Sequence, residues 1–135
     1  LLWGQNGKQE NNTLNMSGGK IRVGGRNAFA QGVQIGMKNG YSQNVTANIT
    51  GGTIELAPTE NGKGYAFTAY KGTYGKFAVS GGEVTGNITA LGLAYIGNVD
   101  LTIAGGSFGV DPTDYVADGC TAAQSNGVWT VTKNG

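Results

Sequence analysis

The side chains in this sequence that can act as general acids or bases are its eight carboxylates, because the chain contains no histidine. Paired carboxylates can catalyse glycoside cleavage. The acidic residues are Glu10, Glu55, Glu60, Glu83, Asp100, Asp111, Asp114 and Asp118. No P-loop, dinucleotide fingerprint or calcium-binding Gly-Gly-x-Gly-x-Asp nonapeptide accompanies them. We therefore predict no catalytic residue, no metal ligand and no cofactor, and we expect that the protein is not an enzyme.

Tyrosines are the best candidates for ligand contacts. A tyrosine offers a flat apolar face to a sugar ring and a hydroxyl to its polar edge. Our candidate ligand-binding residues are Tyr41, Tyr70, Tyr74 and Tyr95. The alternative is that these rings pack in the core or at corners of the fold, and the sequence leaves both interpretations open.

The elements that would position these residues follow a repeat built on a pair of glycines. The pair occurs at 18–19, 51–52, 81–82 and 105–106, each time with apolar residues at alternate positions on both sides. Alternation with a period of two is typical of β-strands, and glycine can adopt the positive φ that a sharp bend needs. Each unit is predicted to be a strand, a tight corner and a second strand.

A third apolar segment follows each of the first three units, at residues 27–36, 64–70 and 87–97. The first glycines of successive pairs are 33, 30 and 24 residues apart, since they stand at 18, 51, 81 and 105. Intervals of this size are typical of solenoids and related repeat folds. The uneven spacing predicts loops at 36–44 and 57–64, both rich in polar residues and glycine.

These observations predict an all-β fold, a right-handed parallel β-helix of about four coils, as a single domain over residues 1–135. We expect an N-terminal cap over 1–12, coils over 13–110 and a C-terminal cap over 111–135. Leu2 and Trp3 are expected to cover the first coil, and Trp129 and Val131 the last, on a hairpin turned at Asn126-Gly127. An antiparallel β-sandwich is the alternative fold.

Aligning the coils on their glycines predicts columns of outward-facing residues. One column holds Thr13, Thr46, Lys76 and Asp100, and a second holds Asn15, Asn48, Ala78 and Thr102. Beyond the corner, Lys20 shares a column with Glu83, and Arg22 shares one with Glu55. Because opposite charges fall in the same columns, these carboxylates are expected to form structural pairs rather than a catalytic group.

Composition limits the possible partners. Only 13% of the residues are charged, and the net charge is +1, so we expect no binding to nucleic acid. No apolar run is long enough to span a bilayer, and we expect no membrane insertion. The start at Leu1-Leu2-Trp3 predicts a mature or excised chain. The single cysteine, Cys120, cannot form an internal disulfide, and we predict that it is buried.

The C-terminal third resembles a known repeat-and-cap pattern. Gly105-Gly106-Ser107-Phe108 is followed by the segment from Asp114 to Cys120 and then by Asn126-Gly127-Val128-Trp129-Thr130-Val131. This order resembles the β-helical modules found in large adhesin-like surface proteins of gut Firmicutes and in phage tail or fibre proteins. The pattern usually has an aromatic residue where this chain has Cys120. The resemblance implies a parallel β-helix on a bacterial cell surface or a virion surface, and it implies no catalytic residues.

Three functional hypotheses follow. The first is a non-catalytic extracellular surface module whose partner is a surface glycan or a host receptor. The second is a structural or receptor-binding segment of a phage tail fibre or spike, which would form a homotrimer. The third is an enzyme of the polysaccharide lyase or hydrolase kind. A fibre should show an apolar outer face, whereas an enzyme should show carboxylates that converge in space.

Overall fold

The computed structural model describes residues 11–25, 29–35, 44–60, 62–69, 74–92 and 99–135. The expected contribution of Leu2 and Trp3 to an N-terminal cap, and most of the predicted loop at 36–44, lie outside these residues. The described chain is almost entirely strand, so the prediction of an all-β fold is confirmed.

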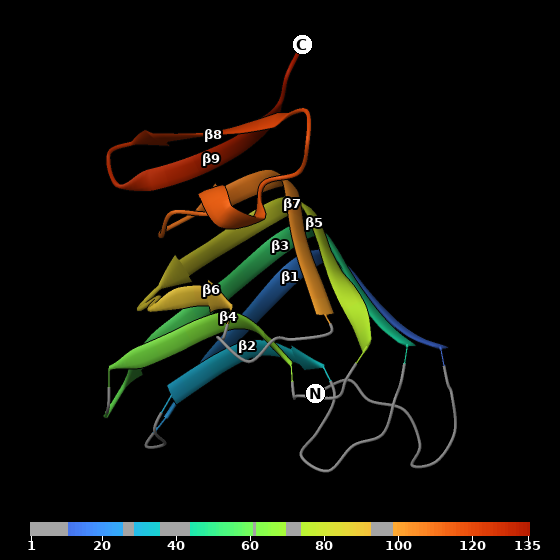
Figure 1. Ribbon diagram of the computed structural model, residues 1–135. Helices are drawn as coiled ribbons and strands as arrows, with labels where there is room; N and C mark the ends of the chain where they lie inside the picture. Colours follow the sequence, from blue (N-terminus) through green and yellow to red (C-terminus); the bar gives the residue numbers. More distant parts are fainter. Residues whose placement is uncertain (1–10, 26–28, 36–43, 61, 70–73, 93–98) are drawn as a thin grey trace.

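Two sheets make up the fold (Figure 1). The larger sheet has the strand order β1-β3-β5-β7-β9-β8, and the smaller has the order β2-β4-β6. From β1 to β7 the chain alternates between the two sheets, so each sheet receives every second strand. The strands are β1 (Asn11–Gly25), β2 (Phe29–Ile35), β3 (Asn44–Thr59), β4 (Lys63–Ala69), β5 (Tyr74–Gly86), β6 (Ala90–Gly92), β7 (Val99–Phe108), β8 (Cys120–Ser125) and β9 (Val128–Lys133).

Neighbouring strands from successive units are parallel in both sheets. The alternative of an antiparallel sandwich is therefore wrong for the repeating part of the chain. The predicted columns are correct, because Thr13, Thr46, Lys76 and Asp100 are successive register partners. The second column is confirmed in the same way, from Asn15 to Thr102.

The glycine pairs form the bends within β1, β3, β5 and β7. The second glycine of every pair has a positive φ, between 79° at Gly19 and 109° at Gly106, which residues with a Cβ rarely adopt. The pairings of β1 with β3 and of β5 with β7 are irregular at the bend, and all three pairings continue beyond the bend in their original register. Strand and corner therefore belong to one long bent element in each unit.

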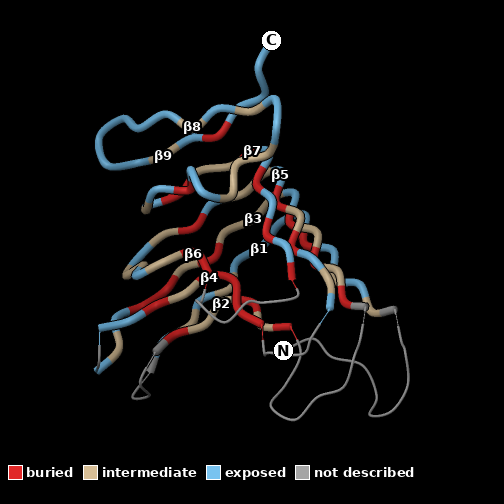
Figure 2. Tube along the Cα trace, in the orientation of Figure 1, coloured by how far each residue is buried: buried red, intermediate tan, exposed pale blue. Residues whose placement is uncertain are grey.

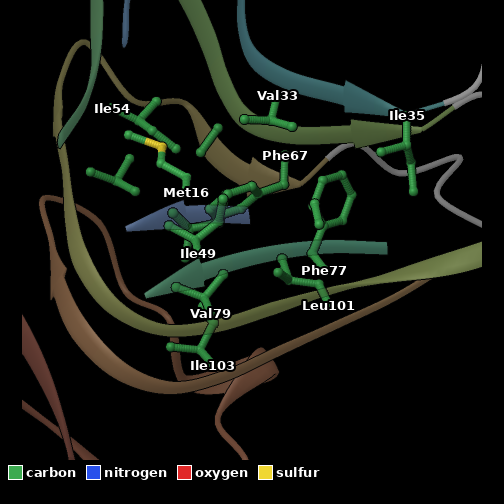
Figure 3. Close-up of a cluster of buried hydrophobic side chains, with 14 of the residues drawn as sticks. Met16, Val33, Ile35, Ile49, Ile54, Phe67, Phe77, Val79, Leu101 and Ile103 are labelled. Carbon is green, nitrogen blue, oxygen red and sulfur yellow. The ribbon is translucent and has the colours of Figure 1, made fainter. Parts of the chain in front are cut away.

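One hydrophobic core lies between the two sheets. Its side chains come from the inner faces of both, and they point toward one another (Figure 3). Phe67 on β4 and Phe77 on β5 are both fully buried, with their ring centroids 5.3 Å apart and a tilt of 47° between the rings. Aromatic pairs at this separation and tilt attract one another beyond the effect of burial alone. These two rings join the sheets across the core.

A β-hairpin closes the C-terminal end of the larger sheet. β8 and β9 are antiparallel, and β9 also pairs with β7 in the antiparallel sense. Asn126 and Gly127, which join them, have φ values of 53° and 79°, as a two-residue type I′ turn requires. Val131 is buried and Trp129 is half-buried against the core, so the predicted packing of these two residues is confirmed. The hairpin is otherwise largely exposed (Figure 2).

Two sequence predictions need correction. We predicted a loop at 57–64, but β3 continues to Thr59 and β4 begins at Lys63. Ala57 is small and apolar enough to be buried there, and the amide of Gly62 closes a tight turn on the carbonyl of Thr59 at 3.0 Å. We also predicted that Cys120 is buried, but it is half-buried at the first position of β8, with Sγ 3.7 Å from the carbonyl oxygen of Ala104.

Candidate functional site

Of the four candidate tyrosines, the structure describes only Tyr74. Tyr74 is the first residue of β5, and 46% of its surface is exposed. Tyr41, Tyr70 and Tyr95 lie outside the described residues, so their contacts stay untested. An exposed ring at the start of a strand is free to meet a ligand, but a single exposed apolar side chain is common on protein surfaces and does not by itself mark a site.

The strands that follow the candidate tyrosines begin beside one another. Asn44, the first residue of β3, is the register partner of Tyr74, and Gly75 is the partner of Val99 at the start of β7. Gly75 has a φ of 153°, and a Cβ there would overlap the carbonyl of Val45 on β3. The absence of a side chain at Gly75 therefore lets β5 approach β3 closely, which sets the position of Tyr74. We call this side of the larger sheet, where β3, β5 and β7 begin, the starting edge.

The outer face of the larger sheet is polar, and its side chains interact along their columns. The Nδ2 of Asn48 donates a hydrogen bond to the Oδ1 of Asn15 at 2.9 Å. Lys76 and Asp100 are register partners as predicted, but the ion pairs within the described part of the chain are those of Glu55. Side-chain hydrogen bonds of this kind stabilise the pairing of neighbouring strands modestly.

Glu55 is held by two cations. Its Oε2 lies 2.6 Å from the Nε of Arg22, its register partner, and its Oε1 lies 3.5 Å from the Nζ of Lys20. The predicted pairing of Arg22 with Glu55 is therefore confirmed. Lys20 also reaches Glu55, although its own column leads through Thr53 to Glu83. A carboxylate fixed in this way is a structural group, and exposed pairs of this kind contribute at most about 1 kcal/mol each.

The other carboxylates that the structure describes are Glu60, Glu83, Asp100, Asp111, Asp114 and Asp118. Within these ranges no three His, Cys, Asp or Glu side chains gather closely enough to hold a metal ion. Asp111 accepts hydrogen bonds from the backbone amide of Thr113, at 2.9 Å, and from its hydroxyl. These bonds, the one from the hydroxyl above all, lower the pKa of Asp111 below its ordinary value. They also fix the start of the short 3-10 turn η1 (Thr113–Tyr115).

A shallow hollow of about 360 Å³ lies beside the hairpin, where the parts of β5 and β7 that follow their glycine pairs meet β9. Val84 and Phe108 form its floor, Val128 reaches it from β9, and Glu83 lies at its rim. Sequence reasoning did not find this hollow, because the residues that line it come from three strands and share no motif. One carboxylate and an apolar floor form a weak contact surface and provide no acid–base pair.

A second hollow, of about 520 Å³, follows the outer edge of β1 from Leu14 to Ile21. All of its lining residues belong to this single strand. It therefore follows one edge strand of the larger sheet and is no cleft between described elements.

Comparison of the chain with protein-family models, with curated proteins and with solved structures gives no match in any of the three. Among the elements that the structure describes, none is a helix with the length and apolar character needed to cross a membrane.

Proposed function

We propose that the chain is a non-catalytic, adhesin-like surface module, built as a right-handed parallel β-helix of about four coils, which binds a glycan at the starting edge. Its place would be outside the cell, on a bacterial surface or on a virion. The resemblance of the C-terminal third to β-helical surface modules supports this location.

The strand pairings support the β-helix. β1, β3, β5 and β7 are successive parallel neighbours, and β2, β4 and β6 are successive parallel neighbours in the other sheet. A chain that alternates between two stacks of parallel strands completes one coil for every pair of strands. Each coil then adds a layer to the common core and begins one more strand at the starting edge.

The observation that carries the glycan proposal is the common start of β3, β5 and β7 with the exposed Tyr74 among them. Tyr41 precedes β3 by three residues, and Tyr70 and Tyr95 precede β5 and β7 by four each, by subtraction from positions 44, 74 and 99. These three tyrosines lie outside the described residues. Under the proposal they and Tyr74 would present their rings to the repeating units of a polysaccharide.

The arrangement of the charged side chains supports a non-catalytic role. The ion pairs to Arg22 and Lys20 occupy Glu55, and Asp111 is bonded to Thr113. Hydrolysis of a glycosidic bond by two carboxylates needs them roughly 5 to 9.5 Å apart across the substrate. The described columns place opposite charges together instead.

A glycan-binding screen on the purified chain tests the proposal. The native protein should bind one class of glycan, and Tyr74→Ala should weaken that binding about tenfold or more through loss of ring stacking. Val128→Ala is the matched control, because Val128 is equally exposed, at 46%, but lies on the hairpin. Equal losses in both variants, or no binding by the native chain to any glycan, would overturn the proposed function.

A further inference from the structure

The first glycine of each pair has a different purpose from the second. At Gly51, Gly81 and Gly105 a Cβ would lie less than 3.0 Å from the carbonyl oxygen of a Ser or Thr on the preceding coil. Those carbonyls belong to Ser17, Thr50 and Ser80 respectively. None of the three glycines has a positive φ, so they are required by the close approach of the adjacent coil rather than by the bend.

Gly18 is the corresponding glycine of β1. Among the described residues, neither a close backbone approach nor a positive φ explains why this position is a glycine. A Cβ built at Gly18 would have nothing within 4 Å, and its φ is not positive. A glycine inside a strand weakens that strand unless another backbone approaches it closely. In the other three coils, the backbone that approaches the first glycine is the Ser or Thr carbonyl of the adjacent coil.

On the same side of β1, the apolar side chains of Leu14 and Ile21 are only half-buried. Of the described strands only β3 pairs with β1, which lies at the opposite end of the larger sheet from the hairpin (Figure 1). Leu14 is half-buried, whereas its register partners Ala47 and Phe77 are fully buried. Ile21 is half-buried in the same way, and the hollow of about 520 Å³ extends between these two positions. The core column therefore ends with partly exposed apolar side chains.

We propose that the outer edge of β1 is a docking site for one further coil of the same pattern, which would add as a parallel strand with a Ser/Thr-Gly-Gly corner. The carbonyl before its glycines would lie over Gly18, as the carbonyl of Ser17 lies over Gly51. This site depends on the observed register of the strands and is independent of glycan binding.

The test uses an extended chain in which residues 11–43 are repeated once, so that residues 1–43 are followed by residues 11–135. Gly18→Ala is made in the first copy, at the new outer edge, or in the second copy, beneath the added coil. Thermal unfolding of each protein is followed by circular dichroism. The native chain with Gly18→Ala, and with Gly51→Ala as its matched partner, is measured in parallel.

We expect the second-copy substitution to lower the unfolding midpoint by about 5 °C or more, and the first-copy substitution to leave it within about 2 °C. In the native chain, Gly51→Ala should cause the large loss and Gly18→Ala should not. Equal effects in the two copies would show that the added coil does not stack on β1. A large loss for Gly18→Ala in the native chain would show that the edge is already covered, by this chain or by a second copy. Either result overturns the proposal.

Discussion

Leucine substitution of the two core rings tests the contact between the sheets. Phe67 and Phe77 lie on different sheets, are fully buried, and have centroids 5.3 Å apart. Because leucine keeps most of the buried apolar volume, Phe67→Leu and Phe77→Leu should each cost about 1 to 2 kcal/mol. Alanine would cost about 3 to 5 kcal/mol, and the double variant would then lose most of a typical stability of about 5 to 15 kcal/mol.

The decisive quantity is the coupling between the two substitutions. Direct aromatic pairs contribute about 0.5 to 1.5 kcal/mol beyond burial, so the double variant should lose less stability than the sum of the single variants by about that amount. Urea unfolding followed by circular dichroism gives all four free energies of unfolding, and the slopes with urea should agree if unfolding is two-state.

A second cycle is the control for this measurement. It combines Phe77→Leu with Val131→Ala, because β9 lies two strands from β5 in the larger sheet, or about 10 Å away. Substitutions so far apart should add to within about 0.5 kcal/mol. Additive losses in the Phe67 and Phe77 cycle as well would refute the packing of the two sheets over one core.

Three further predictions concern the corners, the outer face and the C-terminal turn. Gly82→Ala should destabilise the protein by about 1 to 3 kcal/mol more than Gly19→Ala. Both glycines have positive φ, but only at Gly82 would an added Cβ meet the adjacent strand, 2.9 Å from the carbonyl oxygen of Gly52. Urea unfolding of both variants measures the difference. Glu55→Gln should cost at most about 2 kcal/mol at low ionic strength, since two ion pairs are lost, and almost nothing in 1 M salt, and a loss unaffected by salt would contradict surface ion pairs. Asp111 should titrate with a pKa below its ordinary value of 3.8. Its ionised form therefore contributes stability above pH 3.8, and this contribution is lost as the pH falls through the lowered pKa. Thr113→Val should return the pKa of Asp111 toward 3.8 in an NMR titration.

The repeat and its register could be predicted because the glycine pairs mark the same structural position in every coil. Once the pairs are aligned, alternation along a strand fixes which side chains share a column. The columns of Thr13 and Asn15 and the pairing of Arg22 with Glu55 followed directly, and all are confirmed.

Other features could not be predicted because they depend on packing rather than on pattern. The residues around Ala57 have the composition of a loop, but the chain continues as a strand because small side chains fit inside the coil there. The half-burial of Cys120 depends on how the hairpin lies on β7, which the sequence of the cap does not reveal. Of the candidate site, Tyr74 alone falls in the described residues, and its exposure at the start of β5 was not evident from its neighbours.

The most direct test of the proposed function is to locate a bound glycan on the protein by NMR. A glycan from the screen would be titrated into the isotope-labelled chain, and shifts of the backbone amides would be followed. If the glycan binds at the starting edge, the largest changes should fall at Val45, Gly75 and Val99 and in the segments that precede them. Changes centred on the hairpin β8–β9, or on the outer face around Glu55, would contradict binding at the tyrosine-bearing edge.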